Sequence, residues 1–143
     1  MVFTDGSVCS GTVGCGACAA VVIPLGEGVV VTDSKAVAMK TNSVACEFEG
    51  VLLGIKLNLD FFRVAGYRRS RECAYIFSDC AYVIESVINR NCIREHSELF
   101  EKLVSLEEEL TMMNIDAFLV WIPGHSGIQC NNMVDSIAKD TAH

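Results

Sequence analysis

The chain is predicted to form an α/β domain with the element order βββαβααβα. Three strand-like runs occupy the first 40 residues, and a helical stripe of apolar side chains follows them. Strand-like and helix-like segments then alternate to the end of the chain. Consecutive short strands favour an antiparallel meander, whereas strands separated by helices favour parallel pairing. The sequence therefore predicts a sheet that is antiparallel in its first half and parallel in its second.

The first three strands are predicted over residues 2–5, 14–23 and 29–39. Gly11 and Pro24 bound the second run, and the third is rich in β-branched residues typical of strands. A helix is predicted next, over residues 43–59. Its apolar positions follow the spacing i, i+4, i+7, i+8, i+11, and they are Val44, Phe48, Val51, Leu52 and Ile55.

Residues 61–72 are predicted to be a polar connection. This segment holds four of the eleven basic residues: Arg63, Arg68, Arg69 and Arg71. A short buried strand over residues 73–77 follows and ends at Ser78-Asp79. The arginines are therefore expected at the opposite end of this strand from Asp79.

The remaining elements are two helices, a strand and a last helix. The first helix runs through Val83, Ile84, Val87 and Ile88. A longer one is predicted at about 96–113, with a core side made of leucines 99, 103, 106 and 110. The fifth strand is predicted at 115–121, before a loop rich in proline and glycine. Asn131 is a candidate N-cap for the last helix.

Composition limits the class of protein. The 143 residues suit one domain, expected to be excised from a larger polypeptide, and the 51% of apolar residues argue against disorder. The longest apolar stretches are too short for a membrane span, and no secretory signal opens the chain.

Eight cysteines with a single CxxC pair do not complete a zinc site, and a chain with this much core does not need disulfides. Reduced thiols would place the chain in the cytoplasm or the nucleus.

Four acidic residues carry most of the functional information. Asp5 lies in VFTDGS, Glu47 in ACEFEG, Asp79 in YIFSDC, and Asp135 follows WIPGHSG. Glu47 falls inside the apolar stripe of its helix. A carboxylate on the core side needs a partner, either a nearby Lys or Arg or a metal ion, unless it lies at the boundary of the core. Four carboxylates gathered in a small space cannot all ionise without cations, and Mg²⁺ prefers oxygen ligands. The set therefore predicts a two-metal site that cleaves phosphodiesters.

These motifs together resemble the type 1 ribonuclease H (RNase H) family, and the resemblance covers essentially the whole chain. It rests on TDGS, the helical Glu47 in EFEG, SD at Asp79, and WIPGHSGI followed by Asp135, all in order and spacing. The resemblance implies an RNase H-like fold, a five-stranded mixed sheet with helices on both faces. It also implies endonucleolytic cleavage of the RNA strand in RNA–DNA hybrids.

The resemblance further implies the roles of individual residues. Asp5, Glu47, Asp79 and Asp135 would hold two Mg²⁺ (or Mn²⁺) ions, and His125 would lie on a mobile loop near them. One ion would activate water and the other would stabilise the leaving 3′ oxygen. The 2′-hydroxyl of RNA would be recognised by groups near Gly6, Ser7, Asn42 and Ser43.

Some positions depart from the family pattern. The usual Gly-Asn-Glu before the last acid reads Cys130-Asn131-Asn132, SDS becomes SDC at Cys80, and the basic, Trp-rich protrusion between the middle helices is absent. Short, protrusion-free versions resemble the RNase H domains of reverse transcriptases, especially those of non-LTR retrotransposons. We therefore expect a reverse transcriptase, or another domain of the same polypeptide, as partner.

Three alternatives stay open at this point. The chain could be a stand-alone cellular enzyme like RNase H1, a non-catalytic interaction domain with the same fold, or a transposase- or resolvase-like nuclease. The net charge of −7 predicts weak affinity for nucleic acid without a partner domain. His125 could also be an ordinary surface histidine.

Overall fold

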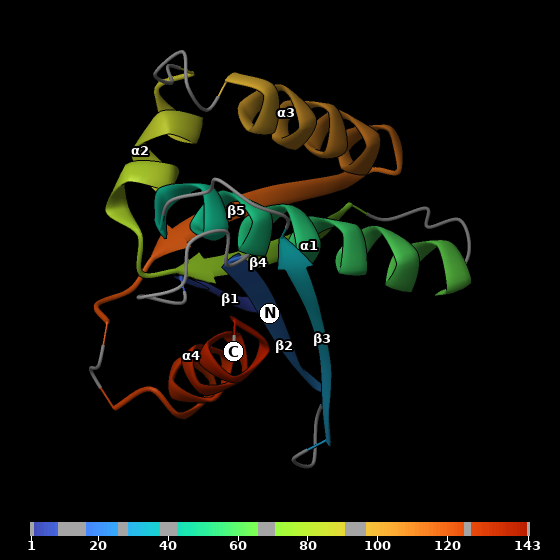
Figure 1. The fold of residues 1–143 in the computed structure, drawn as a ribbon. Helices are drawn as coiled ribbons and strands as arrows, with labels where there is room; N and C mark the ends of the chain where they lie inside the picture. The colour runs from blue at the N-terminus through green and yellow to red at the C-terminus, as the bar shows by residue number, and fades with distance from the viewer. Residues whose placement is uncertain are drawn as a thin grey trace.

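The computed structural model describes residues 2–8, 17–25, 29–37, 43–65, 71–90, 97–124 and 127–142. Its elements follow the predicted order βββαβααβα (Figure 1). They are β1 (Val2–Val8), β2 (Ala17–Leu25), β3 (Val29–Val37), α1 (Ser43–Ala65), β4 (Glu72–Ser78), α2 (Ala81–Ile88), α3 (Ser97–Met112), β5 (Ile115–Trp121) and α4 (Gln129–Ala142). The α/β class expected from the sequence is confirmed.

The strands form one mixed sheet in the order β3-β2-β1-β4-β5. β1, β2 and β3 pair antiparallel, while β1, β4 and β5 pair in parallel. Within the described residues, β1 and β4 share only two residue pairs, Val2 with Ile76 and Phe3 with Phe77. Two positions beyond these pairs lie Asp5, in the middle of β1, and Asp79, directly after β4.

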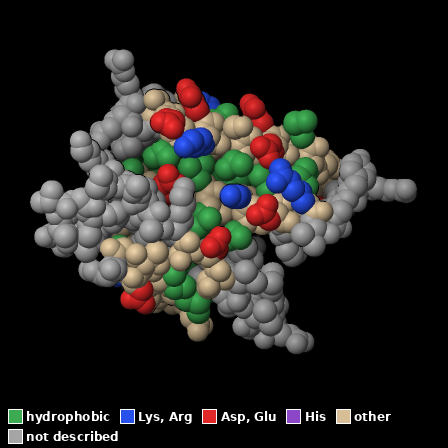
Figure 2. Space-filling model, turned by 45° about the vertical axis from the view of Figure 1, so that its right-hand side comes forward, with side chains coloured by type: hydrophobic (Ala, Val, Ile, Leu, Met, Phe, Trp, Pro, Cys, Tyr) green, Lys and Arg blue, Asp and Glu red, His purple; other side chains and the backbone are tan. Residues whose placement is uncertain are grey.

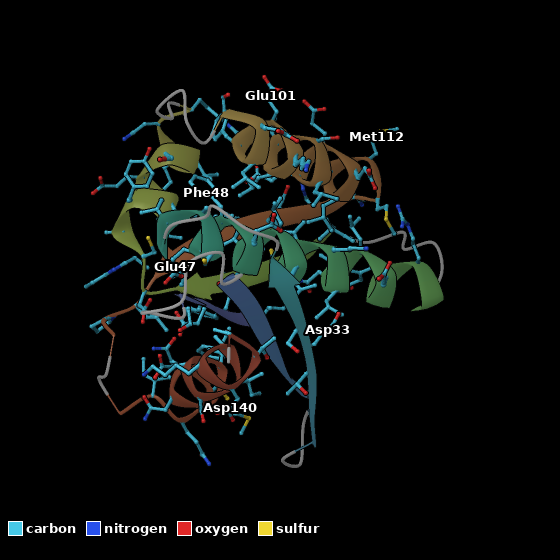
Figure 3. All side chains as sticks on the ribbon, in the orientation of Figure 1. Asp33, Glu47, Phe48, Glu101, Met112 and Asp140 are labelled. Atoms are coloured by element: carbon cyan, nitrogen blue, oxygen red, sulfur yellow. The ribbon has the colours of Figure 1, made fainter. Side chains whose placement is uncertain are left out.

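Helices cover both faces of the sheet. α1, α2 and α3 lie on one side and α4 lies on the other (Figure 1). α1 contributes most of the larger core, where Phe48, Val51 and Ile55 are fully buried against Val2 and Ile76. A smaller apolar cluster lies beneath α4, built around Phe3, Ile122 and Val134. On α3, Glu101 and Met112 point away from the sheet into solvent (Figure 3).

Three predicted ends fell short by two residues or more. β1 continues past Asp5 to Val8. α1 continues to Ala65 instead of ending at residue 59, because Leu59 and Phe62 prolong its buried stripe. β2 continues through Pro24 to Leu25, where it pairs with β3 beyond the end of its pairing with β1. A proline is tolerated where a strand has a neighbour on one side only.

The predicted polar connection is therefore partly helix. Arg63 belongs to α1, and its guanidinium lies 2.8 Å from the carboxylate of Glu109. Arg71 precedes β4 and lies 2.7 Å from Asp116 at the start of β5. Both ion pairs lie at the end of β4 opposite to Asp79, as expected, whereas Arg68 and Arg69 fall outside the described residues.

The described part of the chain contains no helix that is both long and apolar enough to cross a membrane. Among the described residues, no disulfide joins the cysteines at positions 46, 73, 80 and 130.

Candidate active site

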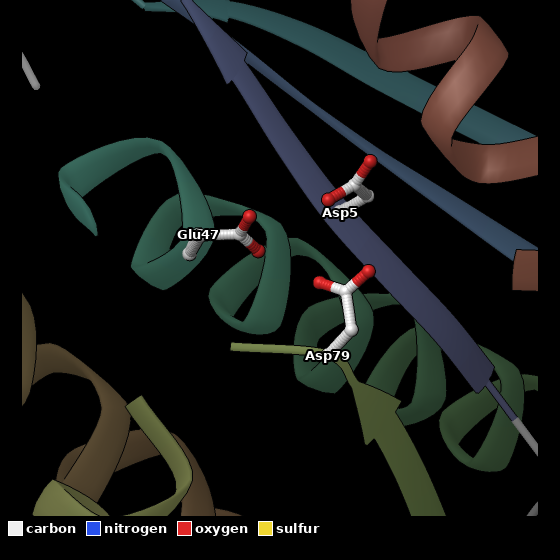
Figure 4. Close-up of side chains that lie close together, drawn as sticks. All are labelled: Asp5, Glu47 and Asp79. Atoms are coloured by element: carbon white, nitrogen blue, oxygen red, sulfur yellow. The ribbon is translucent and has the colours of Figure 1, made fainter. Parts of the chain in front are cut away.

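The sheet and its first helix bring three of the four predicted acids together. Asp5 lies on β1, Asp79 directly follows β4, and Glu47 lies in the second turn of α1. Each offers a carboxylate oxygen, and these oxygens all lie within 4.8 Å of one another. Figure 4 shows the three carboxylates turned toward one another between β1, the end of β4 and α1.

Two glycines allow α1 to approach β1 closely enough for this contact. A β-carbon added to Gly6 would lie 2.3 Å from the backbone carbonyl carbon of Cys46. One added to Gly50 would lie 2.7 Å from the carbonyl oxygen of Asp5. Such distances are far below van der Waals contact, so any larger residue would push the helix and the strand apart. The spacing of Glu47 and Asp5 is therefore set by a backbone-to-backbone contact.

Gly50→Ala is expected to destabilise the domain and to slow cleavage. Overpacking typically costs ~1–3 kcal/mol, which outweighs the gain of about 1 kcal/mol that alanine brings to a helix. The displaced α1 would also move Glu47 away from Asp5. Chemical denaturation and single-turnover cleavage measure the two effects, with Lys56→Ala on the exposed side of the same helix as control. Unchanged stability and rate in Gly50→Ala would show that α1 and β1 can move apart at this contact without loss of stability or activity.

Asp79 is surrounded by the end of β5, the start of α4 and the loop between them. The indole N–H of Trp121 donates a hydrogen bond of 3.1 Å to the backbone carbonyl of Asp79. The amide Nδ2 of Asn131 donates to Asp79 Oδ2 over 3.4 Å. A β-carbon on Gly124 would lie 3.0 Å from the same Oδ2, so only glycine leaves the carboxylate this room without a shift.

Burial and mutual repulsion make the acids reluctant to ionise. Burial, and then the charges of Asp5 and Asp79, raise the pKa of Glu47 to about 10. Burial and the charge of Asp79 raise the pKa of Asp5 to about 7. Glu47 Oε2 is buried and has no hydrogen-bond partner. A divalent cation would remove the repulsion and satisfy that oxygen, so the donor set fits a hard metal ion.

Asp135 lies on α4 beside the cluster. A hydrogen bond between the Asp5 and Asp135 carboxyls further raises the pKa of Asp5, which places the two side by side. The Asp135 Oδ2 also lies 2.6 Å from the ammonium of Lys139, one helical turn further along. The fourth predicted acid therefore borders the cluster of three and is ion-paired with Lys139 of the same helix.

Comparison with known proteins agrees with this geometry. A model of the RNase H family matches residues 1–143, the whole chain. The chain belongs to the RNase H family. The predicted enzyme class, ribonuclease H, is thereby confirmed. No curated protein matches the chain significantly.

Solved RNase H structures share the fold at low sequence identity. RNase H1 from the halophilic archaeon Halobacterium salinarum has a TM-score of 0.69 at 16% identity, covering 98% of this chain and 94% of that one. The N-terminal RNase H domain of a Mycobacterium tuberculosis protein has a TM-score of 0.69 at 18% identity, with 99% and 98% coverage. LC11-RNase H1, solved in complex with an RNA/DNA hybrid, has a TM-score of 0.68 at 16% identity, with 99% and 98% coverage.

The predicted substrate-recognition residues are only partly described. Gly6 and Ser7 follow Asp5 on β1, and Ser43 begins α1. Asn42 and His125 lie outside the described residues, so their roles in this RNase H stay predictions.

Sequence reasoning missed two side chains of the site. Asn131 was expected only as a helix cap, but it lies in the first turn of α4 and reaches Asp79. Trp121 was read only as the end of a strand. Both belong to the WIPGHSGIQCNN stretch, whose similarity to the family was the signal that could have pointed to them.

Proposed function

We propose that this RNase H cleaves the RNA strand of RNA–DNA hybrids endonucleolytically, using two Mg²⁺ (or Mn²⁺) ions. The observation that carries the proposal is the convergence of Asp5 on β1, Glu47 on α1 and Asp79 directly after β4, with carboxylate oxygens within 4.8 Å of one another. Asp135 beside Asp5 is the fourth ligand of the proposed set. The similarity to LC11-RNase H1, which was solved with an RNA/DNA hybrid, supports the choice of substrate.

The residues of the chain would divide the work as follows. Asp5, Glu47, Asp79 and Asp135 would hold the ions, which supply positive charge to activate water and stabilise the leaving 3′ oxygen. Gly6 and Ser7, next to Asp5, and Asn42 and Ser43, at the start of α1, are proposed to recognise the 2′-hydroxyls of the RNA strand. Trp121 holds the backbone of Asp79 through a hydrogen bond, and Gly124 leaves room for the Asp79 carboxylate.

The direct test is cleavage of end-labelled substrates by the purified chain. We expect internal cuts in the RNA strand of a hybrid with Mg²⁺ or Mn²⁺, and none in EDTA. Duplex DNA, duplex RNA and single-stranded RNA of the same sequence are the matched controls. Equal cleavage of duplex RNA would contradict the proposed substrate, and cleavage in EDTA would contradict the metal site.

We further propose that the chain is the RNase H domain of a retroelement reverse transcriptase, with the rest of that polypeptide holding the substrate. In support, five basic side chains of the described residues are already ion-paired with carboxylates: Arg63, Arg71, Arg90, Lys102 and Lys139. On the face shown in Figure 2, basic side chains alternate with acidic ones and gather into no positive patch. A cytoplasmic or nuclear location is part of this proposal.

The alternative is a stand-alone enzyme like RNase H1. It is favoured by the solved RNase H1 structures, of which the chain covers 93–98%. The affinity of the isolated chain for hybrid separates the two possibilities.

We expect the isolated chain to bind a hybrid weakly, and more weakly as salt increases. Phosphate contacts by Lys and Arg dominate the affinity for nucleic acids, and log K falls linearly with log salt. A net charge of −7 leaves few cations to make such contacts. Fluorescence anisotropy with a labelled hybrid, in Ca²⁺ to prevent cleavage, measures both quantities. Tight binding at physiological salt would favour the stand-alone enzyme.

His125→Ala is expected to slow cleavage without abolishing it. His125 is outside the acidic set, and its proposed role is to shuttle a proton or to assist product release. General acid–base assistance typically contributes ~10²–10⁴-fold. Single-turnover and steady-state rates separate the chemical step from release. If neither rate changes, His125 is an ordinary surface residue.

A further inference from the structure

Asn131 is a buried polar residue that the packing of α4 does not require. Its side chain is 2% exposed, and its neighbours on the same side of the helix belong to the apolar cluster around Phe3, Ile122 and Val134. Its Oδ1 is buried without a hydrogen-bond partner. An unsatisfied buried polar atom costs about 1–3 kcal/mol, so an apolar residue here would give a more stable domain.

The only hydrogen bond described for the Asn131 side chain leads to the acidic cluster. Its Nδ2 donates to Asp79 Oδ2 across 52 positions of the sequence. The opposite amide orientation would set two acceptor oxygens against each other, so the carboxylate fixes which end of the amide faces it. The free Oδ1 then lies on the other branch of the same amide, close to the cluster.

We propose that Asn131 is a positioning residue for the metal site. Its Nδ2 orients the Asp79 carboxylate, and its Oδ1 accepts a hydrogen bond from a water that hydrates the bound ion. The inference rests on the metal site proposed above. Partners of metal-ligating carboxylates typically contribute 10–100-fold, as an order of magnitude, to metal affinity or activity.

Metal affinity and metal-free stability respond in opposite ways to this role. Asn131→Leu replaces the amide with an apolar group of similar size, so it removes both the donor and the unsatisfied oxygen. We expect Mn²⁺ binding, measured by calorimetry without nucleic acid, to weaken by ~10–100-fold. The melting temperature in EDTA should stay the same or rise. Asn131→Leu loses one hydrogen bond, to the half-buried Asp79, but it also removes a buried oxygen that has no partner.

Two further variants sharpen the test. Asn131→Ala should weaken Mn²⁺ binding as Asn131→Leu does, although the cavity it leaves will lower the melting temperature. Asn132→Ala alters the same residue type at the next, exposed position and should leave Mn²⁺ binding unchanged.

Three results would overturn the inference. If the wild-type chain bound no Mn²⁺, the metal site itself would be refuted. If the wild type bound Mn²⁺ and both Asn131 variants bound it equally well, only the positioning role would fail. If Asn131→Leu lost stability in EDTA, the residue would be a structural one.

Discussion

Asp79→Asn is expected to reduce hybrid cleavage by at least ~10³-fold while leaving the domain folded. Asp79 faces both Asp5 and Glu47, so it is one of the three clustered carboxylates that would hold the ions. Its replacement removes one negative charge from the ion-binding cluster, and metal ions supply several kcal/mol of transition-state stabilisation. Three powers of ten correspond to about 4 kcal/mol.

The fold should tolerate this change. Asparagine has nearly the same shape, and the charge of Asp79 is one of the causes that raise the pKa of Asp5 and Glu47. The metal-free protein should therefore be as stable as the wild type, or more stable. Single-turnover cleavage and thermal melting measure the two effects, with the exposed Asp140→Asn as control. Wild-type activity in Asp79→Asn would contradict the proposed site.

The metal-free protein is expected to lose stability as pH rises from 5 to 8, and Mg²⁺ should reverse the loss. In the unfolded chain Asp5 and Glu47 release their protons near pH 4. In the folded chain their pKa values are raised to about 7 and about 10. Between these limits the folded state binds more protons, so the free energy of unfolding falls as pH increases. The stabilising effect of the two protonated carboxyls is complete below pH 4, and it is lost as the pH rises through their folded pKa values of about 7 and about 10.

The expected change is large enough to measure by melting. Each unit of pKa shift corresponds to about 1.4 kcal/mol, and 1 kcal/mol shifts the melting temperature of a domain near this size by roughly 2–4 °C. We therefore expect the melting temperature in EDTA to fall by at least ~10 °C between pH 5 and 8. Metal ions bind deprotonated ligands, so the gain from Mg²⁺ should be greater at pH 8 than at pH 5.

Glu47→Gln isolates the contribution of the cluster from other titrating groups. This variant removes the carboxyl with the most strongly raised pKa, so the slope of stability against pH should flatten. An equal slope in Glu47→Gln and in the wild type would show that the acids are not the cause.

The sequence predicted the site's acids because each lies in a local pattern that also fixes its element. Asp5 ends an apolar strand-like run, and Asp79 ends another, so parallel pairing alone brings them together. Glu47 was recognisable because a carboxylate interrupts an apolar stripe. The contact of Gly6 and Gly50 with the opposing backbone was not predictable, since it depends on how closely α1 packs on β1.

Other errors have the same physical origin. The end of α1 was misplaced because the arginines that follow it are polar, while Leu59 and Phe62 still face the core. Arg63 was placed in a connection because its ion pair with Glu109 on α3 joins positions 46 apart. Asn131 was interpreted as a cap because its partner, Asp79, lies 52 positions away in the sequence.

The brief pairing of β1 with β4 makes a seam between the two halves of the sheet. Only two residue pairs and the hydrogen bond from Thr4 Oγ1 to the carbonyl of Phe77 cross it among the described residues. α1 contacts strands on both sides and so acts as a clasp. α1, the helix that supplies Glu47, therefore also holds together the two strands that position Asp5 and Asp79. A substitution that weakens the packing of α1 would therefore have two effects: it would displace Glu47, and it would weaken the contact between β1 and β4.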